Sequence, residues 1–412
     1  MRFLRMLTNS LLAGALGAAF LTIVVLQLNP SVPLASATTW RLFVAFGLFY
    51  GVHLTALFYL LMVGRELVGF RAISPGWVSV RVLAWLTAAS AAGASVLMWL
   101  NVGGLAAALG ETAVRRMTAG AAATTATAIV LLGLAAAHYS FGRRGSRVGA
   151  ALLAIAVFGS LALPVAARGP GVPPSGRSVS TAIAGRALPV SGPRVLMLLL
   201  DGASLEYVWP RAAGGRLPNF ARLLESGASM NLATVRPTGP DPVWASVATG
   251  MYPARNGVRS PSEYYVRGDT RPFALLPDYC FSHVLVHLGF LHREPNSSAS
   301  LRGRPLWSIL AEAGITAGVV RWPLTFPAQP VHGFVLSDRF HQLLGSVLEL
   351  DNSAAYPVDV LPVARNAFVE PGEGPEALPS PVSDSASASP EASAGLRDRF
   401  YSRAMRDLRA CV

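Results

Sequence analysis

Long apolar stretches dominate the first 168 residues of the chain and become rare after them. Several are long enough to cross a bilayer, whose apolar core takes about 20 helical residues. Small residues are frequent in the last three stretches, and small side chains let membrane helices approach closely, so we expect those three to pack together. The predicted spans are residues 11–28, 42–63, 82–100, 117–137 and 148–166.

A different pattern begins at residue 194. Residues 195–200 form a continuous apolar run, which is typical of a buried parallel strand. Shorter runs at 317–322 and 334–336 also predict strands. Apolar residues at helical spacing, each followed by a glycine, predict helices at 217–226, 243–248 and 306–313. Strands that alternate with helices indicate an α/β fold.

These patterns divide the chain into a membrane part and an outer part. Proline, glycine and serine dominate one connecting segment, which is typical of a flexible linker. Proline, serine, alanine and glutamate dominate the C-terminal part, which is typical of low complexity. The predicted domains are a transmembrane helix bundle (1–168), a linker (169–193), an α/β domain (194–371), and a low-complexity segment with a short C-terminal helix (372–412).

Composition and charge agree with a membrane protein. Charged residues make up 14% of the chain and apolar residues 52%, against about 25% charged in a typical soluble domain. Basic residues concentrate before the first predicted span and in the second and fourth loops, which places the N-terminus in the cytoplasm and the C-terminal domain outside it. The net charge of +12 partly reflects these loops. Without a basic patch interleaved with aromatic residues, we expect membrane lipid as a partner and no nucleic acid.

The first span has an alternative interpretation as a signal peptide. Ala35-Ser36-Ala37 resembles a signal-peptidase site after a basic start and an apolar run. The apolar run is longer than the usual signal-peptide core of about 7–15 residues. We therefore expect the first span to remain as an anchor in the cytoplasmic membrane.

Candidate chemistry lies between residues 194 and 260. The apolar run 195–200 ends on Asp201-Gly202, and a carboxylate at the tip of a buried strand is well placed to hold a metal. A polar turn then precedes a second helix, whose N-terminus favours an anion. A metal, a hydroxyl and an anion site together suit phosphoryl or sulfuryl transfer.

This region resembles the type I phosphodiesterase/nucleotide pyrophosphatase branch of the alkaline phosphatase superfamily. The matching motifs, in order, are LLLDG, LPNFARLLESGA, PT..DPVWASVATGMYPARNGV, RPLWSILAEAGITAGVVRWPLTFPAQPVHGF and VLSDRF. The resemblance implies a mainly parallel sheet with helices on both faces, and two divalent metals, with zinc the expected ion. It makes Asp201 a metal ligand and a phosphate ester the substrate.

The nucleophile and the remaining metal ligands do not follow the family pattern. Pro240 occupies the position of the family's nucleophilic Thr or Ser, and the nearby Thr238 is our candidate. Asp241 is an alternative, since a carboxylate can also attack. The family's Asp-His-Gly is absent, and no histidine follows His341.

None of the remaining acidic and histidine residues shows a convincing metal-binding pattern that could replace those ligands. His283 and His287 have zinc-binding spacing but no acidic partner, so we interpret them as ordinary surface residues. We interpret Asp338, in Ser337-Asp338-Arg339, as strand-end structure.

The sequence thus predicts a membrane bundle followed by an incomplete α/β alkaline-phosphatase-like domain. The chain resembles the N-terminal half of a membrane-anchored, extracytoplasmic, metal-dependent phosphodiesterase or phosphatase, truncated and inactive as given. The alternatives are a non-catalytic remnant or binding protein with the same half-fold, and a lipid-linked phospho-headgroup transferase. The substrate, the oligomeric state and the pairing of Cys280 with Cys411 stay open.

Overall fold

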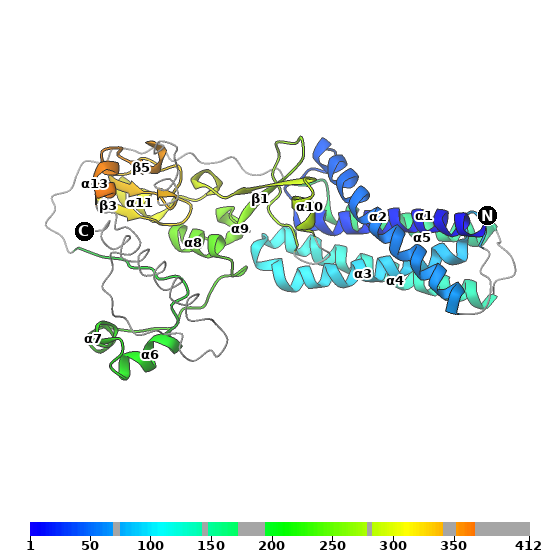
Figure 1. Ribbon diagram of the computed structural model, residues 1–412, viewed down its shortest axis with the longest axis horizontal. Helices are drawn as coiled ribbons and strands as arrows, with labels where there is room; N and C mark the ends of the chain where they lie inside the picture. Colours follow the sequence, from blue (N-terminus) through cyan, green and yellow to red (C-terminus); the bar gives the residue numbers. More distant parts are fainter. Residues whose placement is uncertain (69–74, 142–146, 172–193, 278–281, 341–351, 367–412) are drawn as a thin grey trace.

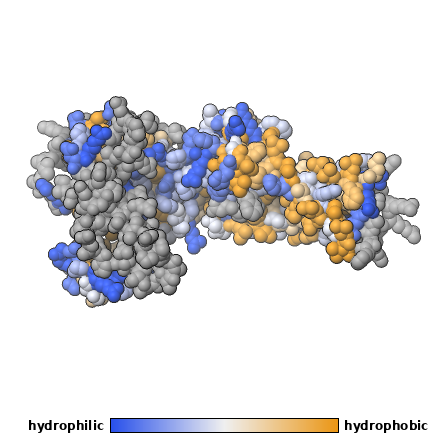
Figure 2. Space-filling view, viewed as in Figure 1, coloured by the Kyte–Doolittle hydropathy of each residue, from blue (hydrophilic) through white to orange (hydrophobic). Residues whose placement is uncertain are grey.

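A bundle of long apolar helices and a smaller α/β part make up the molecule (Figure 1). The computed structural model describes residues 1–68, 75–141, 147–171, 194–277, 282–340 and 352–366. Within these residues, five helices are long and apolar enough to cross a membrane, which confirms the predicted spans. Apolar side chains cover much of the visible surface of this bundle (Figure 2). The helices are α1(Arg2–Leu28), α2(Ala37–Val68), α3(Val80–Leu105), α4(Glu111–Phe141) and α5(Arg147–Arg168), with a short 3-10 helix η1(Ala106–Ala108) after α3.

Helix α1 lies at the centre of the bundle. Two thirds of its most apolar window is buried, against 17% for α5. Its side chains belong to three cores, one shared with α2, one with α3, α4 and α5, and a third in which Leu28 packs with Met117 and Leu275. The second core is rich in buried alanines such as Ala88 and Ala121, which confirms the expected close packing of α3, α4 and α5.

A polar junction closes the C-terminal end of α1. The last carbonyls of a helix lack partners inside the helix, and a cation near them is favourable. Arg168, at the end of α5, is 2% exposed. Its Nε donates to the carbonyl of Leu26 at 2.7 Å, and its Nη2 donates to the carbonyls of Asn29 at 2.7 Å and Val32 at 2.5 Å. One buried guanidinium therefore joins the C-terminal ends of α1 and α5.

Asn29 extends the same junction to the outer part of the chain. Its Nδ2 donates to the carbonyl of Leu275 at 2.8 Å. Its Oδ1 accepts from the backbone N–H of Ala274 at 3.1 Å and of Leu275 at 2.9 Å. These bonds connect α1 to a segment almost 250 positions further along the chain.

An antiparallel hairpin covers the junction. It consists of β1(Ser262–Val266) and β2(Leu291–Pro295), and α10(Val284–His287) precedes β2. Residues of β1 alternate between buried and half-buried. Tyr264 and Val266 on the buried face share a core with Phe46 and other residues of α1 and α2. The Tyr50 hydroxyl lies 3.0 Å from Ser282 Oγ. The hairpin is thus packed on the bundle by apolar contacts and polar bonds together.

The remaining strands form a small mixed sheet. Strands β3(Ala317–Val320) and β4(Gly333–Leu336) are parallel, and β5(Ala355–Tyr356) pairs antiparallel with β4. Ala248 and Trp307 pack with Val319 and Val335 in its core. This arrangement confirms a membrane bundle followed by a partial alkaline-phosphatase-like α/β part. The helices of this part are α6(Leu205–Ala213), α7(Pro218–Ser226), α8(Pro240–Thr249), α9(Pro253–Asn256), α11(Leu306–Glu312) and α13(Val360–Asn366), with 3-10 turns η3(Ser298–Ser300) and η4(Asn352–Ala354).

The prediction of a buried strand at 195–200 is wrong. These residues are extended but pair with no described strand. Val195 is 89% exposed and Leu196 80% exposed. An apolar run becomes a buried strand only where neighbouring strands and covering helices receive it, and the described sheet consists of β3, β4 and β5 alone.

Several other predictions fall on residues outside the described ranges. They concern most of the linker, the low-complexity segment 372–395, the helix at 396–408, Cys280, Cys411 and His341.

Candidate functional site

The carboxyl ends of β3 and β4 meet the N-terminus of α8. Ligand sites in α/β proteins form at this edge of a parallel sheet. Helix α8 begins at Pro240, with Gly239 as its N-cap, because proline suits the first helical position. Trp244 of α8 lies edge-on to Trp322, just beyond β3, with ring centroids 5.9 Å apart. The start of α8 is thereby held against the strand ends.

Asp241 occupies the first turn of α8, where a carboxylate is favourable. Its Oδ2 accepts a hydrogen bond from Asn296 Nδ2 at 2.9 Å. Asn296 is 7% exposed and donates through the same nitrogen to the carbonyl of Ser260 at 2.6 Å. One buried amide therefore fixes the Asp241 carboxylate against the segment that follows α9.

Asp338, which follows β4 closely, organises the loop after β3. Its Oδ1 accepts from the backbone N–H of Phe326 at 3.0 Å, and its Oδ2 accepts from the backbone N–H of Leu324 at 3.2 Å. Leu324 has a φ of 67°, a conformation that L-residues rarely adopt. These bonds agree with the interpretation of Asp338 as strand-end structure, since the carboxylate is occupied by its own loop.

Two carboxylates and two arginines converge on this edge. Burial raises the pKa of Asp241, and the negative charge of Asp338 raises it further, while the Asn296 bond and the charges of Arg339 and Arg293 lower it in part. The Arg339 guanidinium donates to the carbonyl of Asn296 at 2.9 Å. A half-buried carboxyl with a raised pKa at a strand edge marks a candidate functional site. We call Asp241, Asn296, Asp338, Arg339 and Arg293 the strand-edge cluster.

A further buried cation lies beside α8. Val258 packs on Ala245 of α8. The pKa of the next residue, Arg259, is lowered to about 10 by burial and by the charge of Arg302. Its Nε has no hydrogen-bond partner among the described residues. The segment along α8 is therefore electropositive, which suits an anionic ligand.

The two predicted catalytic residues lie outside the strand-edge cluster as the structure defines it. Asp201 is exposed in a turn whose Gly202 has a φ of 72°. The segment before it is exposed too, so Asp201 does not sit at the tip of a buried strand. Thr238 is exposed and lies two residues before α8. Their roles as metal ligand and nucleophile stay predictions.

The described residues do not fit a two-metal centre. They contain no group of three or more His, Cys, Asp or Glu side chains that could hold a metal ion. His292 lies 3.6 Å from Glu294 on the hairpin, and His332 Nδ1 lies 3.2 Å from Thr316 Oγ1. The ring of His283 packs 6.0 Å from that of Tyr264. Each of these histidines has a local partner.

The strand-edge cluster was only partly visible in the sequence. Asp241 was visible as a carboxylate beside Pro240, and Asp338 as part of a strand end. Asn296 carried no signal, because it follows a strand and resembles any polar turn residue. The motif spacing contains no information on contacts across more than 50 positions, which only the fold supplies.

The structure thus defines a membrane-anchored α/β protein with a polar site at its parallel strand ends. Residues 195–391 match the type I phosphodiesterase/nucleotide pyrophosphatase family. This match confirms the resemblance that the motifs predicted and is consistent with that branch of the alkaline phosphatase superfamily. No solved structure matches the chain. Members of the family are generally metal-dependent, and the match indicates a hydrolase-type function.

Proposed function

We propose that this protein is a membrane-anchored hydrolase of phosphodiesters or phosphomonoesters that acts outside the cytoplasm. The observation that carries the proposal is the family match over residues 195–391. The strand-edge cluster supports it, because two arginines and a buried amide beside a helix N-terminus suit a phosphate ester.

The orientation rests on the ends of the helices. Arg2 and Arg65 lie at one end of the bundle, where Arg2 also pairs with Glu66 at 2.9 Å. Basic residues near the ends of spans favour the cytoplasmic side. With an odd number of crossings, this orientation supports a position of residue 194 and those after it on the opposite side, which we propose to be the outer face of the cytoplasmic membrane.

The proposed roles within the site follow the family. Asp201 is the proposed metal ligand and Thr238 the proposed nucleophile. A bound divalent ion, zinc in our proposal, supplies Lewis-acid activation. Because the described residues do not fit a two-metal centre, we derive no catalytic step through the metal. The residues present offer binding: Arg339 and Arg293 attract an anion, and Asn296 holds Asp241 in place.

A second candidate function is phosphate-ester binding without catalysis. Three observations favour it: Asp201 is exposed, Pro240 is the first residue of α8, and no three-ligand metal group occurs in the described part of the chain. The expectation that the chain is inactive as given belongs to this candidate and stays a prediction.

One assay distinguishes the two candidates. The full chain, purified in detergent, is given bis(p-nitrophenyl) phosphate and p-nitrophenyl phosphate with Zn²⁺ or Mn²⁺, beside a heat-treated control. The hydrolase proposal predicts metal-stimulated turnover that Asp201→Asn abolishes and Asp359→Asn preserves, since Asp359 is exposed and lies outside the cluster. Saturable binding of a non-hydrolysable phosphorothioate without turnover would contradict the hydrolase and support the binding protein.

A further inference from the structure

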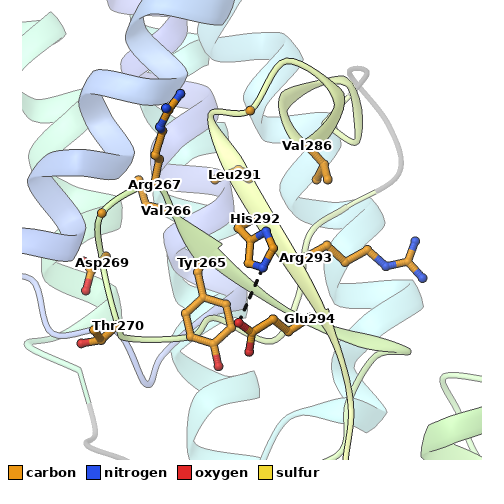
Figure 3. Close-up of a pocket in the computed structure, with 12 residues that line it drawn as sticks. Tyr265, Val266, Arg267, Asp269, Thr270, Val286, Leu291, His292, Arg293 and Glu294 are labelled. Carbon is orange, nitrogen blue, oxygen red and sulfur yellow. Dashed lines mark ion pairs between the residues drawn. The ribbon is translucent and has the colours of Figure 1, made fainter. Parts of the chain in front are cut away.

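A pocket opens on the hairpin and shares Arg293 with the strand-edge cluster (Figure 3). Its volume is about 730 Å³. Val266 and Leu291, both almost fully buried, line it together with Val286. The polar residues that line it are Tyr265, Arg267, Asp269, Thr270, His292, Arg293 and Glu294.

The pocket lies at the height of the membrane surface. Its rim includes the turn at Gly268 and Asp269, which follows β1. Arg41, in the second turn of α2, donates to the carbonyl of Gly268 and lies 3.9 Å from Asp269 Oδ2. The neighbouring Trp40 is 71% exposed at the start of this predicted span. Tryptophans concentrate where the bilayer meets water, so the pocket opens at the level of lipid headgroups.

The Asp269 carboxylate lines the pocket, but the protein's own hydrogen bonds already occupy it. Its side chain is only 9% exposed. Burial alone would raise its pKa, but hydrogen bonds from the Thr38 side chain and from the backbone N–H groups of Arg271 and Thr270, with the charge of Arg41, lower the pKa below its usual range. This carboxylate is held by the turn and by α2.

Arg293 donates through its Nε to Ser262 Oγ at 2.8 Å, and the other charges lie at two ends of the pocket. Arg267 is exposed at the end of β1, beside Gly289 (Figure 3). Glu294 lies on β2, 54% exposed and 3.6 Å from His292. Glu263 lies opposite Glu294 in the hairpin register and accepts from the Tyr265 hydroxyl at 3.0 Å. One end therefore presents a guanidinium, and the other presents carboxylates beside an aromatic ring.

We propose that this pocket binds the headgroup of a zwitterionic phospholipid that carries a primary ammonium. The phosphate takes the Arg267 end, because guanidinium–phosphate bonds are among the strongest in proteins. The ammonium takes the Glu294 end, where carboxylates and the Tyr265 face attract a cation. The inference does not depend on hydrolysis, since Arg267, Tyr265 and Glu294 lie outside the strand-edge cluster.

Lipid binding to the full chain in detergent, followed by native mass spectrometry, tests the proposal. The probes are dihexanoyl phosphatidylethanolamine, phosphatidylcholine and phosphatidylglycerol, and soluble O-phosphoethanolamine. We expect phosphatidylethanolamine to bind tightest, because the choline headgroup has no N–H to donate and the glycerol headgroup has no cation. Arg267→Gln and Glu294→Gln should each weaken its binding about tenfold, the loss of one charged bond.

Arg271→Gln is the matched control, since Arg271 is exposed in the same loop and does not line the pocket. Binding by this variant should equal that of the unmodified chain. Equal affinity for the three lipids, or unchanged affinity in both pocket variants, would overturn the proposal. Binding of O-phosphoethanolamine without any binding of the lipid would overturn the membrane source of the ligand.

Discussion

The bundle with its docked hairpin and the segment from residue 194 to residue 239 differ sharply in how their apolar residues are used. In the first region, helices and strands bury them in shared cores, and buried polar groups at Arg168 and Asn29 are hydrogen-bonded. In the second region, Val195 and Leu196 stay exposed in an extended segment. The comparison teaches that the predicted metal ligand Asp201 follows a segment that packs on no described strand, whereas the helix bundle has well-packed cores.

Removal of the Arg168 guanidinium should have the largest effect on stability. Arg168→Met leaves the carbonyls of Leu26, Asn29 and Val32 without this donor. We expect the free energy of unfolding to fall by roughly 3–5 kcal/mol, since a buried charged network is broken. Thermal unfolding of the full chain in detergent measures this loss.

The matched control is Arg115→Met, whose only ion pair, with Glu111, is exposed on both sides among the described residues. Its effect should stay within about 0.5 kcal/mol. Equal melting temperatures for the Arg168 and Arg115 variants would show that the junction does not hold the C-terminal ends of α1 and α5 together.

Removal of the Asn29 side chain should have a smaller and more local effect. Asn29→Ala removes the Nδ2 donor to the carbonyl of Leu275. It also removes the Oδ1 acceptor of the Ala274 and Leu275 backbone N–H groups. We expect a loss of about 2 kcal/mol and faster hydrogen exchange at those two backbone amides. The exposed Asn219→Ala on α7 serves as the control. Unchanged exchange at Ala274 and Leu275 would show that the Asn29 side chain does not hold this segment on α1.

The smallest effect should come from Asp241. Its pKa is raised in the folded state, so its contribution to stability is complete below the ordinary aspartate pKa and is lost as pH rises through the raised value. Asp241→Asn removes this loss. The melting temperature of the variant relative to the unmodified chain should therefore rise by roughly 1–3 °C between acidic and neutral pH. A difference that falls with rising pH would contradict the direction of the shift.

The sequence predicted the bundle well, because a membrane span is recognised by the length of its own apolar stretch, which does not depend on the rest of the fold. Helices α7, α8 and α11 and strands β3 and β4 also follow from their periodicity and glycine stops. The polar junction was not predictable, since Arg168 and Asn29 contact partners far along the chain. The prediction of a strand at 195–200 was wrong for a related reason. An apolar run can be buried only if other segments cover it, and the run itself does not show whether they do.

Hydrogen exchange of the full chain in detergent tests the central contrast most directly. Among the described residues, the amides of 195–200 make no backbone hydrogen bonds, whereas Tyr264 donates to the carbonyl of Phe273 and Arg267 to that of Phe290. We predict complete exchange at residues 195–200 within the shortest labelling time, and strong protection at Tyr264 and Arg267. Protection at 195–200 equal to that of the hairpin would show instead that the run is a packed strand and that Asp201 is held at its tip.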